Sequence, residues 1–267
     1  MKESTTGIQP VFEARRPIKS EAIKIAETII QAGSMLLTAG AEVYRVEETM
    51  QRMGLSIEGV KECNPYVSAT GIMCTVCTED EMATKVARIY SSERNISIIN
   101  AINSLSRKCV HDHLNVLEID RELNQIKHIP VYHAQMKSLF GAIGAGGFAV
   151  FFYGGLMDVA ASFVIGWVIR ECGLYFEKIR LNPFLIIIVQ SFVAAIIARI
   201  SHYLSMDCDV NTIIISTLML LVPGLSITNG IRDTMMGDYL SGLVRFTESF
   251  VIAASIAIGA GLGIYAF

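Results

Sequence analysis

The sequence predicts an α-helical membrane protein, in which a small cytosolic α+β N-terminal domain is followed by a five-helix transmembrane domain. Charged residues make up only 18% of the 267 residues, below the roughly 25% of ordinary soluble domains. They are also unevenly distributed, because residues 138–267 contain six of the 22 Lys and Arg and eight of the 25 Asp and Glu. The net charge of −3 gives no general attraction to nucleic acid, so no nucleic-acid partner is expected.

The N-terminal half divides into a tail and a folded domain. Residues 1–19 have no apolar core and are not a cleavable signal peptide, so we expect a flexible tail and a domain at 20–134 that stays in the cytosol. Apolar residues at helical spacing alternate there with a segment, 59–90, that is typical of β-strands. We expect strand breaks at Asn64–Pro65 and at the acidic turn 79–81. The helices are expected at 20–38, 39–53, 95–107 and 115–127.

The C-terminal half contains long uncharged runs. They lie at 138–157, 181–198, 210–231 and 249–267. Their lengths match the roughly 20 residues that cross a hydrocarbon core. A shorter run at 159–169 ends at Arg170–Glu171 and reaches spanning length if that pair lies at an interface. We therefore expect a transmembrane domain at 135–267, with helices at about 138–157, 158–176, 181–203, 210–231 and 243–267.

The distribution of basic residues predicts the orientation. With the N-terminal domain inside, the inner loops carry Arg170, Lys178, Arg180, Arg232 and Arg245. The outer connections carry only one arginine and one histidine, at positions 199 and 202. This bias follows the positive-inside rule. We expect a multi-pass protein of the cell (inner or plasma) membrane with a cytoplasmic N-terminus.

No metal site, cofactor or catalytic residue is assigned from the sequence. Cys74 and Cys77 have CxxC spacing, but positions three apart in an extended segment point to opposite faces. Glu42, Arg45 and Glu47 form a charged motif that is either a catalytic carboxylate set or a solvated helix face with ion pairs. No nucleophile and base stand together nearby, which favours the solvated face.

A helix break is expected inside the apolar run 210–231. Pro223 removes a backbone donor and Gly224 tolerates unusual dihedral angles. At membrane depth such a break persists where the freed backbone faces protein or a water-filled cavity, as it does in transporters. The alternative is a simple proline kink.

Polar side chains crowd the segment that follows this break. They are Asn229, Asp233, Asp238, Arg245 and Glu248. Ionisable groups at membrane depth usually face the bundle interior, so these residues are candidates for a substrate or proton pathway. Asp233 and Asp238 would be the proton-sensitive groups, and Arg245 would bind a substrate carboxylate. The alternative is a cytosolic loop at 232–245, in which the charges are simply solvated.

Two sequence blocks resemble the threonine/serine exporter (ThrE) family, and within it the shorter YjjP-like members. They are 39–53 together with 70–89 (AGAEVYRVEETMQRM and TGIMCTVCTEDEMATKVARI), and 223–249 (PGLSITNGIRDTMMGDYLSGLVRFTES). The positions that match are Glu42, Arg45, Glu47, Pro223, Gly224, Asn229, Arg232, Asp233, Gly237, Asp238, Gly242 and Arg245.

This resemblance implies export of small carboxylate-bearing metabolites, which are threonine and serine in one branch and succinate-like dicarboxylates in another. It also implies that a small separate YjjB-like membrane subunit completes the transporter, and it allows for an oligomer in the lipid bilayer.

The leading hypothesis is therefore a secondary exporter driven by the proton gradient, not an enzyme. The chain has no ATP-binding loop of the GxxxxGK[ST] type. The main alternative is a cytosolic enzyme or sensor domain anchored by membrane helices, which leaves a hydrolase-like activity of the N-terminal domain open. A further alternative is a structural subunit that only packs on a transporting partner.

Overall fold

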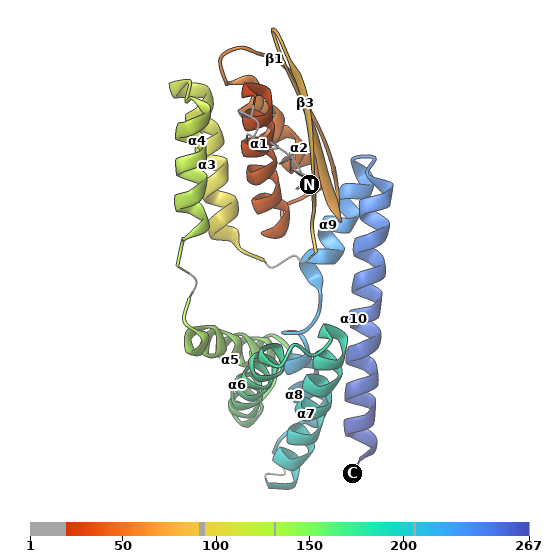
Figure 1. The fold of residues 1–267 in the computed structure, drawn as a ribbon. Coiled ribbons are helices and arrows are strands. Elements are labelled where there is room, and N and C mark those ends of the chain that lie inside the picture. Colours follow the sequence, from red (N-terminus) through yellow and green to blue (C-terminus); the bar gives the residue numbers. More distant parts are fainter. Residues whose placement is uncertain (1–19, 91–93, 131, 205–206, 267) are drawn as a thin grey trace, which may run out of the picture.

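The computed structural model describes residues 20–90, 94–130, 132–204 and 207–266 and shows two regions, one above the other in Figure 1. The N-terminal region combines helices with one sheet, and the C-terminal region consists of helices. The expected tail at 1–19 lies outside the described residues. The fold is thus mostly helical with a small antiparallel sheet, as the sequence predicts.

The N-terminal region packs four helices and a sheet around one apolar core. The helices are α1 (Glu21–Thr38), α2 (Val43–Leu55), α3 (Ile96–Asp112) and α4 (Val116–Lys127). The strands β1 (Val60–Ser68), β2 (Gly71–Thr78) and β3 (Met82–Arg88) form an antiparallel sheet in the order β1-β2-β3. Apolar residues at helical spacing, such as Ile25, Ile29 and Leu36 of α1, are fully buried in this core.

One expected strand break is wrong. Asn64 and Pro65 lie inside β1, opposite Thr75 and Cys74 of β2. Proline has no N–H to give to a ladder, so it is tolerated in a strand at the edge of a sheet, and β1 is such an edge. The turn between β1 and β2 falls instead at residues 69–70.

The C-terminal region has six helices among the described residues. They are α5 (Ala134–Phe151), α6 (Leu156–Lys178), α7 (Pro183–Leu204), α8 (Val210–Leu218), α9 (Gly224–Met235) and α10 (Tyr239–Tyr265). Three of them, α6, α7 and α10, are long and apolar enough to cross a membrane.

A five-helix transmembrane domain is not confirmed by this count. The first expected span begins and ends earlier than predicted, as α5, and its first turn carries Gln135 and Lys137. The run 210–231 forms two short helices, α8 and α9, on either side of residues 219–223. The proline at the start of α9 lacks the N–H that a continuous helix would need.

Close contacts fix the directions of the membrane helices. A Cβ on Gly259 of α10 would overlap the carbonyl oxygen of Ile188 of α7, and one on Gly263 would lie 2.8 Å from the carbonyl oxygen of Phe192. Along this contact the residue numbers of both helices increase in the same direction, so α7 and α10 run parallel. The side chain of Gln190 donates to the carbonyl oxygen of Ile169 at 2.8 Å, close to the connection between α6 and α7, so these two helices run antiparallel.

The alignment of α7 and α10 leaves half of α10 outside the bundle. Gly259 is twenty residues from the start of α10, whereas its neighbour Ile188 is five residues from the start of α7. At 1.5 Å per residue, α10 extends roughly 20 Å beyond α7. Figure 1 shows this extension, together with α9, lying against the N-terminal region.

Candidate functional site

The site is built around the turn that joins α1 to α2. Gly40 has a φ of +88°, a left-handed conformation that glycine adopts without steric strain. This turn leaves the carbonyl oxygens of Gly40 and Ala41 without a helical partner. The turn faces α9 and the extension of α10.

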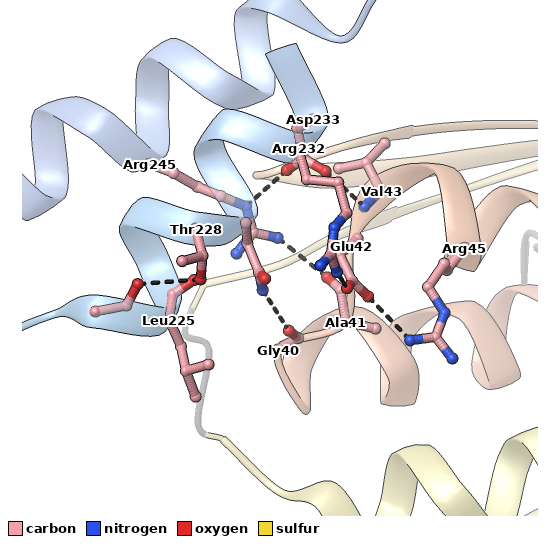
Figure 2. A network of polar contacts seen from close by, with 12 residues as sticks. Gly40, Ala41, Glu42, Val43, Arg45, Leu225, Thr228, Arg232, Asp233 and Arg245 are labelled. Atoms are coloured by element: carbon pink, nitrogen blue, oxygen red, sulfur yellow. Dashed lines mark hydrogen bonds and ion pairs between the residues drawn. The ribbon is translucent and has the colours of Figure 1, made fainter. Parts of the chain in front are cut away.

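Two side chains from the C-terminal region bind these carbonyl groups. Asn229 of α9 donates from Nδ2 to the carbonyl oxygen of Gly40 at 3.1 Å. Arg245 of α10 donates from Nη2 to the carbonyl oxygen of Ala41, also at 3.1 Å. Figure 2 shows Arg245 reaching the turn at Ala41, and a dashed line at Gly40 marks the other contact. Buried backbone carbonyls need such partners, so these bonds hold the two regions together.

Asp233 lies at the centre of the network. Its side chain is fully buried, and its Oδ1 accepts a hydrogen bond from the backbone N–H of Val43 at 3.2 Å. Its Oδ2 lies 2.9 Å from Nε of Arg245, which is itself only 11% exposed. Asp233 therefore connects the first turn of α2 to the start of α10, and the pair is a buried ion pair.

Glu42 forms the outer edge of the network. Its buried carboxylate pairs with Arg232 of α9 and, through Oε2, with Nη1 of Arg45 at 3.4 Å. The two arginine side chains are about half exposed. The single carboxylate of Glu42 thus faces two guanidinium groups, so these three side chains keep one net positive charge at the contact between the regions. We refer to Gly40, Ala41, Glu42, Val43, Asn229, Arg232, Asp233 and Arg245 as the clamp.

Two carboxyl groups beside the turn have a pKa above the usual value. Partial burial raises the pKa of Asp238. Glu47 accepts a hydrogen bond from the N–H of Val67 at 2.8 Å, yet burial and the charge of Asp238 raise its pKa as well. The contact between the two regions therefore contains two carboxyl groups that hold a proton more readily than a fully solvated carboxyl group does.

A cavity of about 650 Å³ lies beside the clamp, between the N-terminal region and the membrane helices. It is lined by Gly40, Arg94, Lys137, Arg170, Leu174, Glu177, Ile187, Ser226, Asn229, Arg245, Glu248 and Ile252. Because Arg245 is paired with Asp233, three cations remain, and none of them forms an ion pair within the described part of the chain. They are Arg94, Lys137 and Arg170. Unpaired cations in a cavity of this size can bind carboxylate groups.

Arg170 is the deepest of these cations. It follows Ile169, whose carbonyl oxygen is bound by Gln190, seven residues inside α7. At 1.5 Å per residue, Arg170 lies roughly 10 Å inside the bundle. Arg94, by contrast, comes from the N-terminal region and donates to Oγ of Ser226 on α9 at 2.8 Å. The cavity therefore extends from the contact between the regions into the helices.

The structure brings the polar candidates together in two sets. Asn229, Asp233 and Arg245 hold the turn at Gly40, and Asn229 and Arg245 also line the cavity with Glu248. Asp238 and Glu47 lie near each other outside the cavity lining. Pro223 and Gly224 stand at the start of α9 and do not line the cavity.

Sequence reasoning did not assign Arg94, Lys137 or Arg170 to a site. Arg170 carries a signal, because together with Glu171 it ends the uncharged run 159–169 inside α6. Arg94 and Lys137 have no such signal in the sequence, since they come together only when the N-terminal region packs on the bundle.

Comparisons with known proteins agree on one family. The family described as "Putative threonine/serine exporter" (ThrE) matches residues 27–266. "Probable succinate transporter subunit YjjP" of Klebsiella aerogenes is 23% identical over 242 residues, which are 90% of this chain and 93% of that protein. The protein of the same name in Escherichia coli is 20% identical over 88% of this chain and 91% of its own length.

A longer relative matches this chain over less than half of its own length. "Threonine/serine exporter" of Corynebacterium glutamicum is 23% identical over 199 residues, which are 72% of this chain but 41% of that protein. These relatives are named as transporters and exporters and not as enzymes. No solved structure matches the chain.

Proposed function

The chain belongs to the threonine/serine exporter (ThrE) family and is a membrane transporter, and we propose that it is the subunit that binds and exports small carboxylate-bearing metabolites. The solutes are threonine and serine, or dicarboxylates such as succinate, as the names of the relatives suggest. The cavity beside the clamp is the site at which we place the solute.

The observation that carries this proposal is the set of cations in the cavity. Arg94, Lys137 and Arg170 face the same space and have no carboxylate partner among the described residues. A charge-assisted hydrogen bond from such a group to a carboxylate contributes about 1.5–3 kcal/mol. Arg170, the deepest cation, is the residue that would hold the carboxylate as it enters the membrane helices.

The break between α8 and α9 supports the same location. Because the chain leaves its helical path before Pro223, α9 starts anew and carries Ser226 and Asn229 to the cavity wall. We propose that this break, at which Pro223 and Gly224 begin α9, positions that wall of the transport path.

Proton coupling is assigned to Asp233 and Asp238. Partial burial raises the pKa of Asp238, and the fully buried carboxylate of Asp233 is paired with Arg245. Protonation of Asp233 would remove its charge from Arg245, which also lines the cavity. Proton binding would thereby free Arg245 for a solute carboxylate, a direct link between the proton and the solute. Glu248 lines the cavity about three turns before Gly259 on α10, and we place it on the solute path.

The proposed role implies a location and a membrane topology for the chain. We propose a cytosolic domain at 20–134 and five membrane crossings in 135–267, with α5 and the α8–α9 segment added to the three long helices. The N-terminus would then face the cytoplasm of a cell whose inner or plasma membrane holds the protein. Because two relatives are called subunits, a small YjjB-like membrane subunit would complete the transporter.

The experiment is efflux from vesicles that contain the purified chain, with and without a small membrane subunit. Vesicles loaded with labelled threonine, serine or succinate report export directly. Replacing Arg170 by glutamine should slow export about 10- to 100-fold, since one charge-assisted bond is lost. The matched control is Lys178→Gln on the same helix, because Lys178 is exposed and does not line the cavity.

Two results would contradict the proposal. Normal export by Arg170→Gln would place the solute elsewhere. Failure of the intact, folded protein to export any of the three solutes with its partner subunit would exclude the proposed solute class.

A further inference from the structure

Glu171 is a charged residue that the solute cavity does not use. It follows Arg170 on α6, so its side chain points about 100° away from the cavity. It is exposed, and within the described ranges it has neither a hydrogen bond nor an ion pair. An exposed carboxylate without a partner would be ordinary on a soluble surface. On α6 such a carboxylate is unusual, because Glu171 lies well inside the helix bundle.

The depth of Glu171 follows from the helix contacts. It lies seven residues before Lys178, the last residue of α6, and next to the level of Gln190 in α7. Both measures place it roughly 10 Å inside the bundle. A charged side chain at such depth is costly when it faces lipid, so membrane proteins turn it toward a cavity or another chain.

The surroundings of Glu171 form a surface that suits a helix. Val164, Trp167, Glu171 and Tyr175 recur every three or four residues and lie on one face of α6. Val164 is 56% exposed and Tyr175 is 63% exposed. Trp167 is the single tryptophan of the chain, and tryptophan and tyrosine are enriched among residues that dominate binding energy. We call these four residues the α6 face.

We propose that the α6 face binds a different membrane chain, whose helix presents an arginine or lysine to Glu171. A second copy of this chain does not fit. In a two-fold dimer the α6 face would meet itself and place two Glu171 carboxylates together. The cation of this chain at the same level is Arg170, which lines the cavity. The inference rests on the proposed role as one subunit of a transporter, and it assigns the surface and the charge of the partner.

The first experiment locates the partner in the intact membrane. A photoreactive phenylalanine derivative replaces Trp167 in the full chain, in cells that also carry a differently tagged second copy. The expected product is a crosslink to a separate membrane chain, and peptide mapping should place it on a helix segment with a lysine or arginine. The matched control is the same derivative at Ile258 of α10, which is 52% exposed and next to Gly259. This position should not crosslink to that chain.

The second experiment tests the charge. Glu171→Lys should lower recovery of the crosslinked partner at least 10-fold, and replacing the mapped cation of the partner by glutamate should restore it. Glu171→Gln tests the same contact without a repulsive charge and should give an intermediate loss. Crosslinking to the second copy, or full recovery with Glu171→Lys, would overturn the proposal.

These outcomes are separate from those of the proposed function. A complex that forms through the α6 face but exports no threonine, serine or succinate would contradict the function and not the interface. Export that persists with Glu171→Lys, when no crosslink forms in the unaltered chain, would contradict the interface and not the function.

Discussion

The two regions of the molecule fill their interiors with different side chains. The fully buried residues of the N-terminal region are large, and include Ile25, Ile29, Leu36, Met50, Met53, Ile102, Ile119 and Leu123. The membrane helices bury isoleucines as well, but their contacts are dominated by small residues. These are Ala142, Ala145, Ala149, Gly166, Ser191, Ala194, Ala195, Ala198, Gly259 and Gly263.

The difference reflects the solvent of each region. In water, burial of large apolar side chains lowers the free energy, at about 25 cal/mol per Å². In lipid this driving force between helices is absent, and helices associate through close packing of their backbones, which small residues permit. The junction uses a third means, because polar side chains of α9 and α10 bind the backbone of the turn at Gly40.

The largest effect is expected from a substitution that disrupts the packing of small residues between the membrane helices. In Gly259→Leu, the new side chain would collide with the backbone of α7 at Ile188, which cannot move aside as a flexible side chain can. We expect destabilisation above about 4 kcal/mol, seen as loss of a folded, monodisperse protein in detergent. Gly261→Leu is the control, since nothing lies within 4 Å of that position. Equal stability of the two variants would show that backbone contact is unimportant in this region.

The second effect concerns the junction. Arg245→Gln leaves the buried carboxylate of Asp233 without its cation. Removing one partner of a buried pair costs about 3–5 kcal/mol, so the turn at Gly40 should detach and gain hydrogen exchange. The control is Arg232→Gln, whose side chain is half exposed and whose loss should cost at most about 1 kcal/mol. Unchanged exchange in Arg245→Gln would mean that the buried pair does not hold the regions together.

A smaller effect tests the large-residue core. Ile29→Val removes one buried methylene from the N-terminal region and should cost about 0.5–1.5 kcal/mol in the free energy of unfolding. The same change at Ile258, which is 52% exposed on α10, should stay within about 0.5 kcal/mol. Thermal unfolding of both variants measures the difference. Similar costs would argue against distinct packing rules for the two regions.

The smallest effect is a pH dependence of the junction. The pKa of Asp238 is raised above 3.8 in the folded protein, so the folded state binds a proton more tightly than the unfolded state does. Its contribution to stability is complete at low pH and is lost as pH rises above 3.8 through the raised value. Asp238→Asn should therefore flatten the fall of melting temperature with rising pH in this window. A variant with the same pH profile as the original would contradict the assignment.

Local patterns in the sequence explain much of the fold. The spacing of apolar residues predicts α1, α2, α3 and α4, because an amphipathic helix records its buried face in the sequence. It misplaces the break at Pro65, since a pattern within one strand does not say whether that strand lies at an edge. It also treats 210–231 as one helix, because hydropathy measures the length of an apolar run and not its continuity.

The site is less predictable than the fold. The charges at 229–248 are visible as an unusual cluster, but the structure divides them, because Asp238 lies beside Glu47 and not at the cavity. Half of their partners are backbone groups of Gly40, Ala41 and Val43, which carry no signature in a sequence. The sequence also places these charges at membrane depth, whereas α10 extends beyond α7 and carries them to the contact between the two regions.

The clamp also has a consequence for how this chain can change over evolution. Glu42 and Arg232 are 190 positions apart and form one ion pair. A substitution at either position is best tolerated when the other changes with it, so the two blocks should vary together among descendants of this gene. In a chimera, an N-terminal domain taken from another family member should pack best on these membrane helices when its residue at position 42 complements the charge at position 232.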